Sequence, residues 1–270
     1  MPTNPDLTEH FRSLHVPGVP LLIPNPWDVG SATILESLGF RALATTSGGF
    51  AGTLGRVDGS VSREQALAHA AQIAEAVAIP VSADLESCFA QDPAGVAETV
   101  RLAAGTGVAG CSIEDYDRAE GRMYAASPAT ERVAAAAEAA HSGPRRLVLT
   151  ARADNGFHGI DDLDDTIARL RAFEAAGADV LYAPMVSRLD DLRRIRDAVS
   201  LPINVLARPH APTVTGLAGV GVARISVGSG FFLAAMGELV NAARELLDEG
   251  TYEFLQTAGI GRAAAAGAFG

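Results

Sequence analysis

Charged side chains follow three apolar, strand-like segments of this sequence, at residues 80–83, 107–113 and 147–151. In a parallel barrel the C-terminal ends of all strands open onto one face, so groups that are far apart in the sequence meet there. We therefore expect a cluster of charge at that face. Its members would be Asp84, Glu86, Glu114, Asp115, Arg152 and Asp154.

Three of these residues, Asp84, Glu86 and Glu114, form an all-oxygen set of candidate metal ligands. Carboxylate oxygens suit a hard divalent cation that keeps several waters, which predicts Mg²⁺ or Mn²⁺. Such a metal would attract an anionic substrate and stabilise an enolate oxygen as it forms. The alternative is that these acids cap strand ends or pair with arginines.

Arg152 and Trp27 are candidates for substrate binding. The planar fork of Arg152 suits a carboxylate or a phosphonate. It could also bridge to Asp154 or Glu114, and both interpretations can hold at once. Trp27 is the only tryptophan and follows the first strand-like segment, where it is either a wall of the pocket or part of the core.

Two further segments follow strand-like runs. Ser47, Gly48 and Gly49 could present backbone N–H groups to a carboxylate, although an ordinary turn also explains the glycines. His210 follows the seventh run and is a candidate acid or base, but a lone histidine is more often neither.

The pattern of apolar runs predicts the fold class. Eight strand-like segments alternate with helical ones, and the strands lack period-two alternation, as expected for a parallel sheet covered by helices. This predicts an α/β fold of the (β/α)8 TIM-barrel type, with a doubly wound open sheet as the alternative. The barrel would span residues 1–249, and the tail 250–270 would pack on a neighbouring subunit or form a lid. The expected strands are 19–23, 41–47, 79–84, 108–113, 147–152, 179–183, 203–207 and 224–227, with a glycine-containing loop at 48–59.

Composition narrows the partners and the location. The formal net charge is −11, which argues against nucleic acid and anionic membrane surfaces as partners. The two cysteines, Cys88 and Cys111, do not form a disulfide framework. Neither a signal peptide nor an apolar run of membrane-spanning length is evident, so we expect a cytoplasmic protein.

Five motifs together resemble the isocitrate lyase/phosphoenolpyruvate mutase superfamily. They occur in the expected order and cover most of the predicted barrel. The motifs are NPWDVGSA at 25–32, TTSGG at 45–49, VSADLES at 81–87, GCSIED at 110–115 and LTARAD at 149–154.

This resemblance implies a role for each matching residue. Asp84 would bind Mg²⁺ directly, whereas Glu86 and Glu114 would hold it largely through water. Asp58 matches a family aspartate near the metal. The 2-oxo or 2-hydroxy acid end of the substrate would be bound by Trp27, Ser47, Gly48 and Arg152, and the family also implies a homotetramer whose eighth helix is exchanged between subunits.

The segment after Asp115 departs from the family pattern. Lyases of the superfamily carry a K-[KR]-C-G-H segment there, with a cysteine as proton donor, and the phosphonate mutases carry a lysine- and asparagine-bearing gating loop. Residues 116–122 read YDRAEGR instead, without cysteine. We expect the loop 116–127 to determine specificity.

The resemblance and its departures leave three hypotheses of function. The first is a lyase or decarboxylase that acts on a small 2-oxo or 2-hydroxy (di)carboxylate through an enolate, in the manner of oxaloacetate decarboxylase or of dimethylmalate and methylisocitrate lyases. Tyr116 or His210 would supply the proton, with Arg122 and Tyr124 as alternatives. The second is P–C bond chemistry on phosphonopyruvate or phosphoenolpyruvate. The third is a non-catalytic barrel that binds a dicarboxylate.

Overall fold

The computed structural model describes residues 6–143 and 145–269. Its main sheet is parallel, and hydrogen bonds join the strands in the order β1-β10-β9-β8-β7-β4-β3-β2. The edge strands β1 and β2 meet through the amide of Ala44, which donates to the carbonyl of Pro24 over 3.0 Å, so the barrel nearly closes. The prediction of a (β/α)8 barrel is therefore confirmed. The strands are β1 (Leu21–Ile23), β2 (Leu43–Ala44), β3 (Val81–Asp84), β4 (Gly110–Glu114), β7 (Val148–Arg152), β8 (Val180–Tyr182), β9 (Ile203–Leu206) and β10 (Arg224–Ser226).

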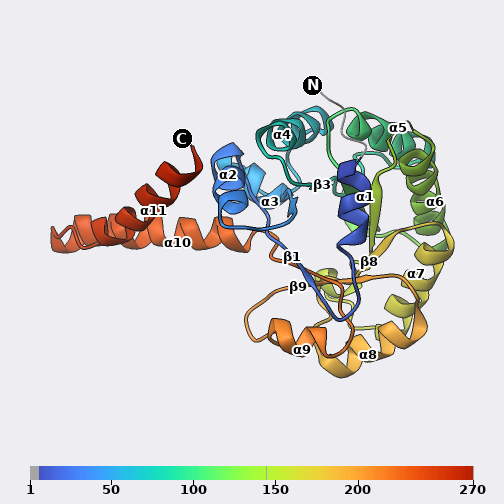
Figure 1. Cartoon of the computed structure of the whole chain (residues 1–270). Coiled ribbons are helices and arrows are strands. Elements are labelled where there is room, and N and C mark those ends of the chain that lie inside the picture. Colours follow the sequence, from blue (N-terminus) through green and yellow to red (C-terminus); the bar gives the residue numbers. More distant parts are fainter. Residues whose placement is uncertain (1–5, 144, 270) are drawn as a thin grey trace.

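Helices surround the barrel (Figure 1). Polar side chains cap several of them, as the sequence signals require: Ser62 accepts from the backbone of Gln65 at the start of α4, and Asp92 precedes Pro93 at the start of α5. The strands between them are buried on both faces, which explains their continuous apolar runs. The helices are α2 (Val29–Ser37), α3 (Ser47–Thr53), α4 (Arg63–Ala76), α5 (Pro93–Ala104), α6 (Ala126–Ser142), η1 (Asn155–His158), α7 (Leu163–Ala175), α8 (Leu189–Ala198), α9 (Val214–Ala218) and α10 (Gly230–Arg244).

Helix α1 (Asp6–Ser13) lies across one opening of the barrel (Figure 1). Its Phe11 packs in a buried cluster with the first residues of several strands, among them Leu21 and Val148. A Cβ on Gly110, at the start of β4, would lie 2.9 Å from the Phe11 ring, so this close approach requires glycine. Because α1 closes the N-terminal ends of the strands, the C-terminal ends remain available for a site.

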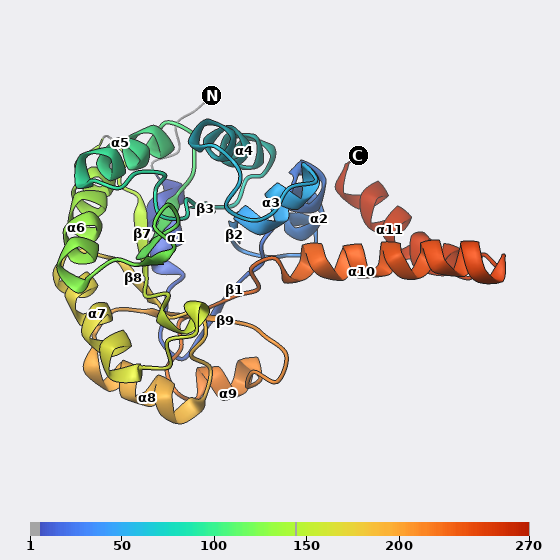
Figure 2. The same ribbon diagram turned by 180° about the vertical axis from the view of Figure 1, so that it is seen from behind.

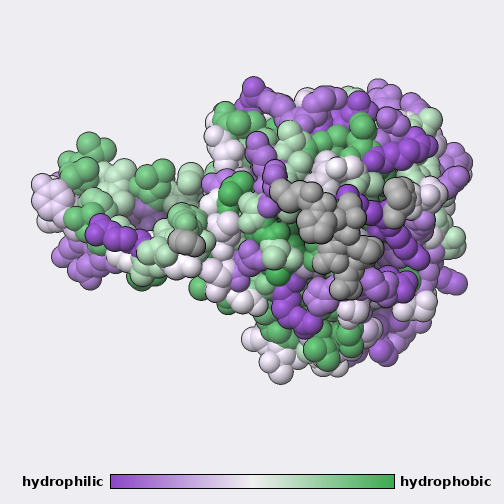
Figure 3. Space-filling model, turned by 45° about the horizontal axis from the view of Figure 1, so that its top comes forward, coloured by the Kyte–Doolittle hydropathy of each residue, from purple (hydrophilic) through white to green (hydrophobic). Residues whose placement is uncertain are grey.

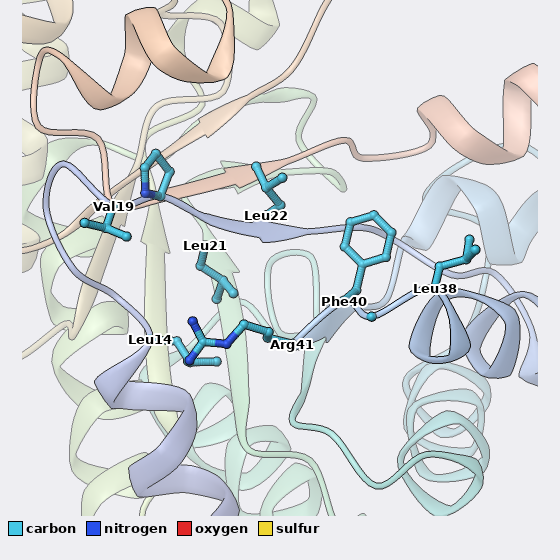
Figure 4. Close-up of a pocket in the computed structure, with 9 residues that line it drawn as sticks. Leu14, Val19, Leu21, Leu22, Leu38, Phe40 and Arg41 are labelled. Carbon is cyan, nitrogen blue, oxygen red and sulfur yellow. The ribbon is translucent and has the colours of Figure 1, made fainter.

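A cavity of about 270 Å³ lies where β1 and the segment before β2 diverge (Figure 4). Leu14, Leu22, Phe40 and Arg41 are among its lining residues. Since Leu14 belongs to the buried cluster around α1, this cavity is at the N-terminal end of the barrel.

The segment after β2 differs from the expected loop. Residues Ser47–Thr53 form helix α3, and the side chain of Thr46 caps it by accepting from the amide of Gly49. A Cβ on Gly49 would lie 2.5 Å from Thr46 Cγ2 and 3.2 Å from Trp27 Cβ. Glycine occurs here because of close packing inside a short helix, which the sequence pattern alone does not reveal.

The C-terminal helices extend from the barrel as an arm (Figures 1 and 2). Helix α10 continues through the π-helical turn η2 (Glu245–Glu249), and α11 (Leu255–Ala268) folds back to contact α2 of the same chain. The arm carries exposed apolar side chains (Figure 3), including Leu233 at 62% and Leu239 at 60% exposure. Three expectations for this region stay predictions: the division at residue 250, the packing of the tail on a neighbouring subunit, and the exchange of the eighth helix in a tetramer. No helix of the described residues is long and apolar enough to span a membrane.

Candidate active site

Asp84 ends strand β3, and its carboxylate joins groups from three neighbouring strands and helices. Its Oδ2 accepts from the backbone amide of Ser47 at 3.2 Å, at the start of α3. Its Oδ1 lies 3.4 Å from the hydroxyl of Ser112 and 3.5 Å from Nη1 of Arg152. The amide of Asp84 donates to Thr45 Oγ1 over 2.8 Å, which fixes the end of the strand. The predicted metal ligand and two predicted substrate-binding residues are thus adjacent.

Arg152 ends strand β7 and is paired on both sides. Its Nη1 lies 3.2 Å from Glu114 Oε2, and its Nη2 lies 2.9 Å from Asp154 Oδ2. The guanidinium also lies over the ring of Tyr182 at 5.4 Å. Burial acts to lower the pKa of Arg152, but the carboxylates of Asp154 and Glu114 outweigh it and raise the pKa well above its usual value. Arg152 is therefore a permanent cation at the centre of the cluster.

Glu86 and Glu114 are each only 3% exposed. Burial raises the pKa of Glu114 to about 8, with the nearby charges of Asp154 and Asp84 acting in the same direction and Arg152 opposing them. Burial likewise raises the pKa of Glu86 to about 7. Glu86 Oε1 is buried and has no hydrogen-bond partner among the described residues. Such an oxygen calls for a cation or a water at this position.

A short hairpin after β4 inserts Arg118 into this cluster. Strand β5 (Tyr116–Asp117) pairs with β6 (Arg122–Met123), and the Asp117 carboxylate accepts from two amides of the turn. Arg118 Nε lies 2.8 Å from Glu86 Oε2, and its Nη2 lies 3.4 Å from Glu114 Oε1 and 3.8 Å from Asp58 Oδ2. Sequence reasoning missed Arg118, although a cation four residues after Glu114 was a usable signal.

Asp115 supports the base of the hairpin instead of facing the cluster. Its carboxylate accepts from the amide of Asp154 at 2.8 Å and pairs with Arg169 at 3.1 Å, and its carbonyl accepts from the amide of Tyr124. Arg169 also donates to the carbonyl of Tyr124 over 2.9 Å. Burial raises the pKa of Asp115 to about 6. This residue holds the start and the end of the loop together.

The loop that carries Glu86 has an unusual backbone. Glu86, Cys88 and Phe89 have φ angles of 51°, 59° and 53°, a region that favours glycine. Arg132 on α6 lies behind this loop, where it is 2% exposed and donates to backbone carbonyls. Its guanidinium lies 4.1 Å from the ring centroid of Tyr124, so it also contacts the hairpin segment. The acceptors are the carbonyls of Ser87 at 2.7 Å, Ala90 at 2.7 Å and Gln91 at 2.5 Å.

Tyr116 stacks on His158, with ring centroids 3.4 Å apart and an interplanar angle of 5°. Burial lowers the pKa of His158, and the nearby charges of Arg118 and Arg152 lower it further against the opposing effect of Asp154. The imidazole is therefore neutral near pH 7. Sequence reasoning missed His158, because no pattern marks the short helix η1 that carries it.

Three predicted residues lie at the edge of the cluster or apart from it. The Trp27 ring packs edge-on against Phe232 at 5.7 Å and lines a cavity of about 350 Å³ with residues of α2, Phe231 and Phe269. Gly48 is close to the cluster, because a Cβ there would lie 3.4 Å from Asp58 Cγ. His210 is exposed in the loop after β9, and no contact of the described residues links it to the carboxylates.

The chemistry of these side chains fits a hydrated divalent cation. Among residues 6–143 and 145–269, no three His, Cys, Asp or Glu side chains converge closely enough to bind one ion directly. A site with one direct carboxylate and others that act through water does not require such convergence. The unpartnered oxygen of Glu86 and the partly exposed carboxylate of Asp84 supply acceptors of this kind.

Comparison with known proteins identifies the family. A family model described as phosphoenolpyruvate phosphomutase matches residues 11–247. The chain belongs to this family. The resemblance drawn from the five motifs is thereby confirmed.

Relatives of this phosphoenolpyruvate phosphomutase family member carry several names. An uncharacterized protein of Mycobacterium tuberculosis is 34% identical over 242 residues, which are 88% of this chain and 89% of that protein. The 2-methylisocitrate lyase of Escherichia coli is 29% identical over 210 residues, 71% of this chain and 70% of the lyase. An oxaloacetate decarboxylase of Rhodopseudomonas palustris is 34% identical over 146 residues, 52% of this chain and 48% of that protein.

One solved structure is similar over nearly the whole chain. The crystal structure of a putative lyase/mutase from Burkholderia cenocepacia has a TM-score of 0.90 and 45% identity, and the match covers 95% of this chain and 93% of the other.

Both cysteines of this phosphoenolpyruvate phosphomutase family member are buried, and burial raises the pKa of the Cys88 thiol. The structure offers no thiol at the site in place of the missing loop cysteine among the described residues.

Proposed function

We propose that this protein is a Mg²⁺- or Mn²⁺-dependent carbon–carbon lyase or decarboxylase. Its substrate would be a small 2-oxo or 2-hydroxy (di)carboxylate, and the reaction would pass through an enolate. The observation that carries this proposal is the convergence of the Ser47 amide and Arg152 on the Asp84 carboxylate, over 3.2 Å and 3.5 Å, at the C-terminal ends of the strands. Relatives named as a lyase and as a decarboxylase support the same reaction class.

The residues divide into metal-binding and substrate-binding groups. Asp84 would bind the metal directly, and Glu86, Glu114 and Asp58 would hold its waters. Mg²⁺ or Mn²⁺ would supply Lewis-acid stabilisation of a developing enolate oxygen. The unpartnered Glu86 oxygen supports this assignment, and so does a phosphonopyruvate hydrolase of the same fold whose structure contains oxalate and Mg²⁺.

Substrate anchoring would fall to groups beside Asp84. The Gly48 amide would donate to the substrate carboxylate, and Arg152 would bind an oxygen of its 2-oxo or 2-hydroxy end. The Ser47 amide holds Asp84, and the buried Gly49 amide donates to Thr46 Oγ1, so the expected role of Gly49 in substrate binding is not kept. Trp27 would close the pocket next to Gly49, to which its Cβ is close.

Proton transfer would involve the hairpin. Tyr116 lies two residues from Arg118 and stacks on the neutral His158, so its ring is held beside the cluster. We assign to the Tyr116 hydroxyl the proton that the enolate would accept. His158 would hold the tyrosine ring in position. His210 is the weaker candidate because its side chain is exposed and away from the contacts described above.

P–C bond chemistry is the second candidate, because the matching family model is described as a phosphomutase. The same carboxylates and Arg152 would also bind phosphonopyruvate. The metal site therefore does not distinguish this second candidate reaction from the first. A non-catalytic dicarboxylate-binding barrel is the third possibility. Its buried acids of raised pKa would then lack a chemical use, and this counts against it.

A substrate panel tests these candidates. Purified protein with Mg²⁺ is incubated with oxaloacetate, methylated malates and methylisocitrate, and pyruvate or the second product is measured. Phosphonopyruvate is followed in parallel by phosphorus NMR. The Asp84→Asn variant serves as the inactive control. Release of pyruvate that depends on Asp84 supports the proposal, whereas turnover of phosphonopyruvate alone replaces it with the second candidate, and ligand-dependent thermal shift without turnover replaces it with the third.

The assembly belongs to the same proposal. We propose a homo-oligomer, a tetramer in which α10 is exchanged, in a cytoplasmic protein. The exposed apolar side chains of α10 support it. Light scattering coupled to size-exclusion chromatography would give the subunit number, and a monomer at micromolar concentration would contradict it.

A further inference from the structure

The guanidinium of Arg118 lies among the carboxylates that would hold the metal. Its partners Glu86 and Glu114 are almost fully buried, whereas Arg118 itself is 35% exposed. The shortest contact, 2.8 Å from Nε to Glu86 Oε2, is a charge-assisted hydrogen bond. Arg118 is therefore a cation bound at the site, with one side open to solvent.

A glycine provides the space for this side chain. Gly59 has a φ of +80°, and a Cβ at that position would lie 2.9 Å from Arg118 Cζ. The slot for the guanidinium is thus part of the fold around Asp58, and the position of Arg118 does not depend on the hairpin alone.

Charge balance in the cluster explains why a cation is held there. Asp58, Glu86 and Glu114 all face Arg118, and Arg152 already pairs with Asp154 and Glu114. Acids buried this close to one another repel strongly in a low dielectric unless cations lie between them. A guanidinium and a hydrated dication satisfy the same oxygens, and the two cations repel each other.

We propose that Arg118 is an intramolecular counter-ion that occupies the metal-binding carboxylates in the metal-free protein and is exchanged for the divalent cation. This inference rests on the proposed metal-dependent function. Exchange needs no refolding, because Arg118 lies in the turn of the short hairpin and already reaches solvent. The released guanidinium then faces the pocket bounded by Gly59, Phe89 and Tyr124.

The proposal makes a counter-intuitive prediction about affinity. Removing Arg118 leaves the carboxylates without their internal competitor, so Mn²⁺ should bind more tightly to Arg118→Gln than to the wild type, by about tenfold or more. Arg122→Gln is the matched control, because it removes the same charge from the exposed far strand of the same hairpin. Its Mn²⁺ affinity should stay within about twofold of wild type.

Mn²⁺ binding is measured by electron paramagnetic resonance without substrate, so the readout does not depend on turnover. Equal or weaker binding by Arg118→Gln would overturn the counter-ion role and leave the proposed function intact. If neither wild type nor variant binds Mn²⁺, the metal-dependent function fails as well, which separates the two results.

A second measurement covers the case in which Arg118→Gln does not fold, as judged by circular dichroism. Trypsin cleavage after Arg118 in the wild type is followed by mass spectrometry with and without Mn²⁺. Exchange predicts faster cleavage at Arg118 when Mn²⁺ is bound, with cleavage after the exposed Arg188 as the internal reference. An unchanged or slower rate at Arg118 would contradict the exchange.

Discussion

Replacing Arg132 with methionine should destabilise the loop that carries Glu86. Methionine keeps much of the apolar stem but removes the guanidinium and its donors. The part-buried carbonyls of Ser87, Ala90 and Gln91 would then lose the guanidinium as their partner. The loop also contains three residues in the left-handed region, and it persists because its surroundings hold it.

The magnitude follows from these contacts. A buried carbonyl left without a partner costs about 1–3 kcal/mol; because these three are only part-buried, water replaces some of the lost bonds and the total is roughly 3–6 kcal/mol. Two effects offset part of this loss: the variant has no arginine charge to bury, and the loop can relax. We expect the free energy of unfolding to fall by about 3 kcal/mol, a large share of the usual 5–15 kcal/mol.

Urea unfolding followed by circular dichroism measures this change, and Mn²⁺ affinity reports whether Glu86 has moved. The control is Arg101→Met, an arginine that is 59% exposed on the neighbouring helix α5 and pairs with Glu98, where the loss should stay below about 1 kcal/mol. If Arg132→Met unfolds within about 1 kcal/mol of wild type and binds Mn²⁺ equally well, the idea that Arg132 holds this loop is wrong.

Three further outcomes are expected. Asp84→Asn keeps an acceptor for the Ser47 amide but loses the charge, so turnover should fall by about 100-fold while the melting temperature stays near wild type; an active variant in the pyruvate assay would contradict its role. Glu86 and Glu114 have folded pKa values of about 7 and about 8, above their unfolded values, so the metal-free native state binds more protons than the unfolded state and its stability should fall as pH rises from about 5 to 8. Urea midpoints with chelator across this range measure the effect, and a flat profile would argue against the raised pKa values. Gly48→Ala would place a Cβ 2.6 Å from Ser229 Oγ and should cost about 1–3 kcal/mol of stability, with part of the loss recovered when Ser229→Ala is added.

The sequence predicted the barrel and the centre of the site for one physical reason. Apolar runs identify buried parallel strands, and parallel strands deliver the residues after them to one face. This reasoning predicts Asp84, Glu114 and Arg152 at one face of the barrel, and the structure places them within contact distance. The two proposed pairings of Arg152, with Asp154 and with Glu114, both occur.

The parts that sequence reasoning missed depend on how loops fold back. Arg118 and His158 reach the cluster from a hairpin and a short helix whose positions are set by tertiary contacts. Helix α3 was expected as a loop, because its glycines are there for close packing and carry no periodic signal. The secondary-structure propensity of a segment gives little information where contacts with a distant part of the chain determine the conformation of its backbone.

The left-handed backbone at Glu86, Cys88 and Phe89 has a consequence for directed evolution. Glycine at such a position relieves about 1 kcal/mol of conformational cost, so a selection for heat resistance alone would enrich it wherever the replaced side chain contributes little to packing. Cys88 is fully buried and Phe89 packs against the core, so at these two positions lost packing offsets the gain in backbone freedom. At position 86 the same stabilising change deletes a metal-site carboxylate, so thermostable clones that converge on Glu86→Gly would be well folded and catalytically weak.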